Sequence, residues 1–118
     1  MSAQVQSDAS YVLITDALVR EIVQKIVAAF KPQKIILFGS RAYGEPAPDS
    51  DVDLLVVTNA LKTHSVFERH RAVSDVFPDR RFALDVLVRT PKELEQLVNR
   101  GPAFFKEIVT RGKVLYER

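Results

Sequence analysis

The sequence contains no cysteine, which excludes disulfide bonds, thiolate metal sites and cysteine nucleophiles. No apolar run approaches the ~20 residues that cross a bilayer. The first ten residues have neither a basic leader nor an apolar core, so we expect no membrane segment and no signal peptide. Charge of one sign is also lacking, because the 17 basic residues exceed the 15 acidic ones by only two. We therefore expect a cytoplasmic protein that is not a dedicated nucleic-acid binder.

What the chain does contain is typical of a small globular protein. It has 118 residues, 47% of them hydrophobic and 27% charged, which favours one compact domain with a core of its own. Residues 1–10 are small and polar, so we expect a flexible N-terminal tail there and a single domain over residues 11–118.

Hydrophobic periodicity predicts alternating helices and strands. Apolar residues three and four apart predict a first helix from Tyr11 to Phe30, which Pro32 ends. Turn and capping signals predict four further helices: a short one from Ser40, then 64–77, Pro91 to about Asn99, and 103–111. Apolar, β-branched runs predict strands at 34–38, 51–57 and 82–88, with a short one at 113–116. This order predicts an α/β (α+β) domain built on one sheet.

Three aspartates stand in the predicted strands. Asp51 and Asp53 are two residues apart on one strand, so both side chains project from the same face of the sheet. Asp85 lies inside the apolar strand 82–88, where an ionised group needs compensation for its lost hydration. If the two strands are neighbours, the three carboxylates converge, and divalent cations offset their repulsion. Oxygen ligands of this kind suit Mg²⁺.

Each of these features also has a purely structural interpretation. Asp-x-Asp at the start of a strand is often a solvated edge or a turn cap, and Asp85 alone could pair with a buried arginine. Gly39-Ser40, at a predicted junction of strand and helix, could bind a phosphate, or could merely end the strand and cap the helix. The combination favours a functional site.

The spacing of these residues resembles the signature of the nucleotidyltransferase superfamily that includes DNA polymerase beta. Gly39-Ser40 is followed after ten residues by Asp51-Val52-Asp53. The longer strings, residues 39–44 and 50–56, are similar to those of the minimal nucleotidyltransferases of bacteria and archaea. The resemblance runs from about residue 34 to residue 85, and the ending at residues 112–117 is also similar. It implies the nucleotidyltransferase fold, in which helices flank a mixed β-sheet.

The resemblance implies a reaction at the three carboxylates. Asp51 and Asp53 would hold two Mg²⁺ ions, and Asp85 would complete the catalytic metal site and accept the proton of an attacking hydroxyl. The expected reaction transfers a nucleoside monophosphate and releases pyrophosphate.

The resemblance also implies where the nucleotide binds. Gly39 and Ser40 would grip the triphosphate of ATP or of another nucleoside triphosphate. Arg41 is a further candidate for a phosphate contact, although it could equally belong to an ion pair. Tyr43 departs from the family pattern, in which an arginine is frequent at this position. No phosphate-binding arginine is therefore expected at residue 43.

Minimal nucleotidyltransferases of this kind are commonly paired with a small helical HEPN-domain toxin. The resemblance therefore implies an antitoxin that transfers AMP from ATP to a hydroxyl, such as a tyrosine, of that partner within a homo- or hetero-oligomer. The stretch after Asp85 is too short for a second domain that encloses an acceptor, so we expect another molecule to present it. Two alternatives remain: a catalytically silent antitoxin that masks its partner, and transfer to a small molecule or RNA.

Other polar and aromatic residues are expected to have structural roles. His64 and His70 lack metal-ligand spacing and are expected at solvated positions of a charged helix. A basic cluster interrupted by acids is expected to form a solvated face, not a nucleic-acid patch; it comprises Arg69, Arg71, Arg80 and Arg81. The helical stripe of Phe104, Phe105 and Ile108 is more typical of a core or a partner interface than of a base-stacking platform.

Overall fold

The computed structural model describes residues 14–44, 51–78 and 81–118, so the tail predicted at residues 1–10 lies outside the described residues. Along the described chain five helices and four strands follow one another: α2 (Asp16–Phe30), β1 (Lys34–Phe38), α3 (Ser40–Tyr43), β2 (Val52–Val57), α4 (Val66–Ser74), β3 (Leu84–Arg89), α5 (Pro91–Arg100), α6 (Ala103–Arg111) and β4 (Lys113–Glu117). None of these helices combines the length and the apolar character that a membrane crossing requires.

The strands form one mixed sheet in the order β3-β2-β1-β4. β1 pairs antiparallel with both β2 and β4, whereas β2 and β3 run parallel. A parallel pair needs a crossover connection, and the crossover between β2 and β3 contains α4. The predicted fold class, an α/β domain on one mixed sheet with flanking helices, is therefore confirmed.

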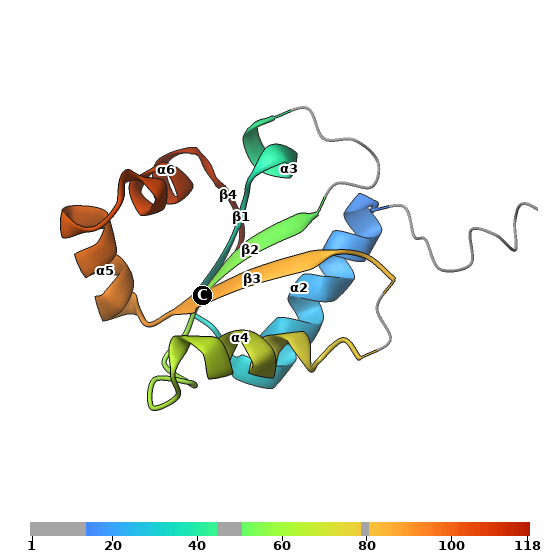
Figure 1. Cartoon of the computed structure of the whole chain (residues 1–118). Coiled ribbons are helices and arrows are strands. Elements are labelled where there is room, and N and C mark those ends of the chain that lie inside the picture. The colour runs from blue at the N-terminus through green and yellow to red at the C-terminus, as the bar shows by residue number, and fades with distance from the viewer. Residues whose placement is uncertain (1–13, 45–50, 79–80) are drawn as a thin grey trace, which may run out of the picture.

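Helices cover the two faces of the sheet unequally. α2 and α4 lie on one face, while α5 and α6 lie together on the other, beside the point where β3 ends (Figure 1). The first residues of β2 and β3 extend beyond α5 and α6 on that second face (Figure 1). One end of the sheet is therefore left open on the side of α5 and α6.

Alternation along the strands produces a separate core on each face. The core beneath α2 and α4 includes Ile22, Ile26, Ile35, Leu37, Val52, Leu54, Val56, Val86 and Val88. The core beneath α5 and α6 includes Ile36, Phe38, Leu55, Val57, Phe105 and Ile108. Because Asp53 and Leu55 are two apart, as are Asp85 and Leu87, both aspartates belong to the face of α5 and α6.

The helix and strand boundaries follow local capping. Thr90 and Glu93 form the predicted capping box, with Pro91 at the first helical position of α5. A second box, Ser65 with Glu68, begins α4 later than the predicted residue 64. The strand predicted at 34–38 is confirmed, whereas β2 and β3 start one and two residues later than predicted, at Val52 and Leu84.

The prediction that Arg69 belongs to a solvated face is wrong, because only 4% of this residue is exposed. Its guanidinium donates hydrogen bonds to the carbonyls of Leu61, Lys62 and His64 at 2.9 to 3.1 Å. It also forms a two-pronged ion pair with Glu93, at 2.6 and 3.1 Å. Arg69 therefore joins α4 and the loop before it to the first turn of α5.

The solvated position predicted for His70 is also incorrect. His70 is half-buried, and its Nδ1 lies 2.7 Å from the carbonyl oxygen of Val86 on β3. β3 is an edge strand, and the carbonyls of Ala83 and Arg89 accept from β2, so the Val86 carbonyl faces away from the sheet. The histidine thus occupies an edge position that would otherwise be open to another strand.

Candidate active site

The sheet register places two of the predicted carboxylates side by side. In the parallel pair of β2 and β3, Asp53 lies opposite Asp85, and Asp51 immediately precedes β2. In the antiparallel pair of β1 and β2, Phe38 lies opposite Asp53, so the end of β1 that leads into Gly39 borders the same place. The structure therefore confirms that the two aspartate-bearing strands are neighbours.

This group of residues lies on the uncovered end of the sheet. Asp51 and Asp85 are exposed and Asp53 is half-buried, whereas Leu55 and Val57, further along β2 on the same face, are buried beneath α5 and α6. Asp85 was expected to need compensation for burial, but its exposure leaves it hydrated, so its place in an apolar strand carries no such penalty. The carboxylates are accessible to a ligand that approaches this face.

The surroundings of Asp53 disfavour the ionised form of its carboxyl group. Burial, followed by the negative charges of Asp85 and Asp51, raises the pKa of the Asp53 carboxyl above its ordinary value. A cation beside the three carboxylates would reverse the effect of the two neighbouring charges. The ionised site is therefore disposed to take up positive charge.

The donor set fits Mg²⁺, which takes oxygen ligands from a few carboxylates and completes its shell with water and phosphate. Among the described residues, no three Asp, Glu, His or Cys side chains are already gathered closely enough to hold a metal ion. Because Asp51 and Asp85 are exposed, their carboxylates can turn toward Asp53 without displacing core side chains. Two properties of these carboxylates therefore suit Mg²⁺: they offer oxygen ligands, and they repel one another, which a cation would offset.

Glycine is required at position 39 by the backbone conformation there and by the closeness of Asp53. Its φ of 75° and ψ of −160° lie in a region that essentially only glycine adopts. A Cβ at this position would lie 3.1 Å from the Cγ of Asp53 and would collide with its carboxylate. Gly39 therefore lets the turn after β1 pass directly against Asp53.

We expect Gly39→Ala to disturb both the fold and the site. The strained backbone should lower the free energy of unfolding by about 1–3 kcal/mol, and displacement of the Asp53 carboxylate should weaken Mg²⁺-dependent ATP binding. Thermal unfolding and calorimetric titration measure the two effects. In the double variant Gly39→Ala/Asp53→Ala the collision is absent. Its free energy of unfolding should therefore be higher than the losses measured for the two single variants, added together, would predict. Simple additivity would contradict the contact between these residues.

The remaining predicted nucleotide contacts lie on the short helix that follows Gly39. Ser40 is the exposed first residue of α3, directly after Gly39 along the chain. Arg41 is half-buried and lines a hollow of about 230 Å³ between α2 and β4. None of the three aspartates lines that hollow. The structure thus keeps Gly39 beside the carboxylates and places the Arg41 side chain in different surroundings.

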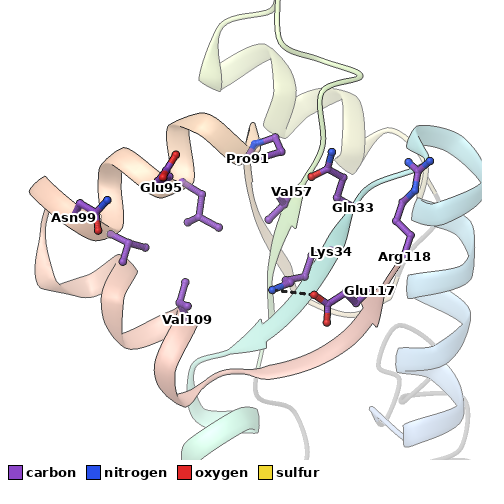
Figure 2. Close-up of a pocket in the computed structure, with 11 residues that line it drawn as sticks. Gln33, Lys34, Val57, Pro91, Glu95, Asn99, Val109, Glu117 and Arg118 are labelled. Atoms are coloured by element: carbon purple, nitrogen blue, oxygen red, sulfur yellow. Dashed lines mark ion pairs between the residues drawn. The ribbon is translucent and has the colours of Figure 1, made fainter.

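A separate groove of about 750 Å³ lies at the other end of the sheet (Figure 2). Val57, Pro91, Leu94 and Val109 contribute apolar walls, and the Lys34–Glu117 ion pair, at 3.3 Å, lies at its rim. None of the six predicted site residues lines this groove. Its size does not make it the reactive centre, because the clustered carboxylates lie elsewhere.

Comparison with known proteins agrees with this geometry. The family model described as "Polymerase beta, Nucleotidyltransferase" matches residues 20–118. The crystal structure of a Sulfolobus solfataricus protein assigned as a nucleotidyltransferase is 28% identical, has a TM-score of 0.62, and is aligned over 86% of this chain and 79% of that chain. A search of curated protein sequences found no match.

Two further structures show likeness of fold alone. A crystal structure of a toxin-antitoxin with AMP-PNP is 20% identical with a TM-score of 0.52, over 84% of this chain and 73% of that chain. The BolA domain of SufE1 from Arabidopsis thaliana is 22% identical with a TM-score of 0.53, over 68% of this chain and 98% of that chain.

The region matched by the family model includes every residue predicted for the site, from Gly39 to Asp85, and extends over most of the chain. The chain belongs to the polymerase beta-like nucleotidyltransferase family.

Proposed function

We propose that this chain transfers AMP from ATP to a hydroxyl, such as that of a tyrosine, of a HEPN-domain toxin, and thereby acts as its antitoxin. Membership of the family supports nucleotidyl transfer in general. A toxin-antitoxin structure with AMP-PNP has a similar fold. The observation that carries the proposal is the register that sets Asp53 beside Asp85 on the open end of the sheet.

In this proposal the three carboxylates bind the metal, and the turn after β1 binds the nucleotide. Asp51, Asp53 and Asp85 would hold Mg²⁺, while Gly39 and Ser40 would bind the triphosphate. Arg41 would have to turn out of the hollow between α2 and β4 to contact a phosphate as well. When bound, two Mg²⁺ ions would supply positive charge to the attacking and leaving oxygens of an in-line displacement. The close approach of Gly39 to Asp53 keeps the triphosphate-binding turn next to the carboxylates.

Asp85 accepts the proton of the attacking hydroxyl, a role that its exposed position on β3 permits. The hydroxyl oxygen forms a bond to the α-phosphorus of ATP. The bond from that phosphorus to the oxygen between the α- and β-phosphates breaks, and this oxygen leaves with the pyrophosphate. The products are a phosphodiester-linked AMP on the acceptor and free pyrophosphate.

The open end of the sheet favours an acceptor presented by a second protein. Asp51 and Asp85 are exposed, and α5 and α6 cover only the far part of β2 and β3 (Figure 1). A docked partner can supply both the hydroxyl and the missing wall of the site. The added AMP would place charge and bulk on the partner's surface, which would inhibit a ribonuclease by blocking RNA access.

The test is the intact mass of a HEPN-domain toxin, with the product of the neighbouring gene as the candidate, after incubation with ATP, Mg²⁺ and this chain. We expect a mass gain of whole AMP units that is lost with Asp51→Ala and retained with Asp75→Asn, an exposed aspartate on α4's C-terminal side. Inhibition of the partner without any adduct would instead establish masking. An adduct only on a small molecule or RNA would overturn the protein acceptor while leaving nucleotidyl transfer intact.

A further inference from the structure

We propose that Phe104 is a wall of the nucleotide site, on which the base of the bound nucleotide stacks. This inference rests on the proposed nucleotide-binding function. It assigns the base side of the site, whereas the carboxylates and Gly39 account only for the phosphates and metal. The support comes from the exposure of Phe104, its aromatic neighbours and the direction in which α6 crosses the sheet.

Phe104 differs in exposure from the rest of its helical stripe. Phe105 is 7% exposed and Ile108 is fully buried, and both belong to the core beneath α6. Phe104 is 45% exposed. The predicted core role is therefore correct for Phe105 and Ile108, but the core leaves nearly half of Phe104 uncovered.

Two aromatic neighbours hold the Phe104 ring in place. Its centroid lies 5.7 Å from that of Phe38, at an interplanar angle of 85°, and 5.3 Å from that of Phe105, at 75°. Edge-to-face contacts of this kind fix a ring without covering it. Since Phe38 lies opposite Asp53 in the sheet, Phe104 is separated from the carboxylate group by a single side chain.

The direction of α6 shows on which side of that helix Phe104 lies. Arg111, seven residues later and hence on the same side, stacks over Tyr43 of α3 at 4.4 Å. Val109 lies on a different side and lines the groove at the far end of the sheet (Figure 2). Phe104 therefore lies on the side of α6 that faces α3.

At the other end of α6, Phe105 packs beneath Arg89 of β3, with the guanidinium 5.5 Å from the ring centroid. The start of α6 therefore lies near the end of β3, and its last residue lies beside α3. Phe104, the second residue of α6, contacts Phe38, which lies in the same row across the sheet as Asp53 and Asp85. An exposed aromatic face at this place suits the flat π-surface of a nucleobase.

The experiment compares two ligands, Mg²⁺-ATP and Mg²⁺-tripolyphosphate, by calorimetric titration of the full chain. Phe104→Ala should weaken ATP binding by about 5- to 150-fold, the range of one lost base–aromatic stack. It should leave tripolyphosphate binding within twofold, because that ligand has no base. Phe104→Tyr keeps the ring and should bind ATP like the original chain.

The matched control is Val109→Ala, since Val109 is 40% exposed on the same helix but lines the far groove. It should change neither titration. ATP binding by Phe104→Ala within twofold of the original chain, or an equal loss of both ligands, would overturn the role of Phe104. If the original chain binds neither ligand, the nucleotide site itself fails; if Asp53→Asn loses both ligands while Phe104→Ala loses neither, only the present inference fails.

Discussion

Replacing Asp53 by asparagine is expected to reduce nucleotidyl transfer by about 10³-fold or more, because it removes a central carboxylate of the proposed metal site. Loss of metal-centred charge stabilisation is worth several kcal/mol, and each 1.36 kcal/mol corresponds to roughly a tenfold change in rate. The measurement is release of pyrophosphate, or transfer of labelled AMP, at saturating Mg²⁺ and ATP. Asp75→Asn, which removes an exposed charge elsewhere, should retain activity.

The same substitution should stabilise the fold at neutral pH. The pKa of Asp53 is raised in the folded protein, so the folded chain binds this proton more tightly than the unfolded chain does. Stability from this group is therefore present at low pH and declines as the pH rises through the folded pKa. At pH 7 the ionised Asp53 opposes folding, and a neutral asparagine relieves this.

Thermal unfolding measured across pH tests this sign. Asp53→Asn should unfold at a higher temperature than the original chain at pH 7, and the difference should shrink toward zero as the pH falls below about 4, where carboxyls become protonated. Added Mg²⁺ should raise the unfolding temperature of the original chain more than that of the variant. A variant that is less stable at pH 7, with no response to pH, would show that Asp53 has a structural role instead.

Arg69→Ala is expected to be the most destabilising single change among those considered. It removes the ion pair with Glu93 and leaves the carbonyls of Leu61, Lys62 and His64 without their donor. Breaking a buried pair of this kind typically costs about 3–5 kcal/mol. The unfolding temperature should fall by more than about 10 °C for a domain of this size. Arg71→Ala, an exposed arginine two residues away on the same helix, is the control and should shift it much less.

The ion pair between Arg69 and Glu93 should also make the stability of the fold depend on pH in the acidic range. Hydrogen bonds from the Arg69 guanidinium lower the pKa of Glu93 to about 2, and the Thr90 backbone contributes in the same direction. Because the folded pKa is depressed, this stabilisation is present above the ordinary carboxyl pKa of 4.5 and is lost as the pH falls toward 2. The Glu93 side chain is 39% exposed, so solvent screens part of the pair's energy.

Glu93→Gln separates the pair from the rest of the Arg69 network. It should destabilise the fold at pH 7, and its deficit relative to the original chain should narrow between pH 4.5 and pH 2. Denaturant unfolding at several pH values measures this. A deficit that stays constant over that interval would show that the charge of Glu93 contributes nothing to stability.

The carboxylate group could be predicted from the sequence because it depends on local periodicity and on one pairing of strands. Two-residue spacing puts Asp51 and Asp53 on one face, and the short crossover makes β2 and β3 neighbours, which aligns Asp53 with Asp85. Gly39 was expected to bind a phosphate or to end the strand, and its close approach to Asp53 could not be predicted. The metal and nucleotide roles of these residues stay predictions.

Arg69 and His70 could not be placed from the sequence, because their environment comes from distant parts of the chain. Charged neighbours such as Glu68 and Arg71 made the whole segment look solvated, whereas Arg69 is buried by contacts that include Glu93, and His70 contacts Val86. The Thr90-Pro91-Lys92-Glu93 capping box predicted where α5 begins. It gave no indication that the same glutamate accepts an arginine from α4.

The sheet order also determines when during folding the site is complete. β4, the last described strand along the chain, lies beside β1, the first, so closing the sheet joins Lys34 to Glu117 across most of the sequence. Contacts this distant carry a large loop-closure entropy and are formed slowly. While the chain is being synthesised, β1 remains unpaired on one side until residues 113–117 have emerged. The Gly39 turn, which directly follows β1, therefore gains its rigid support only after β4 has paired with β1.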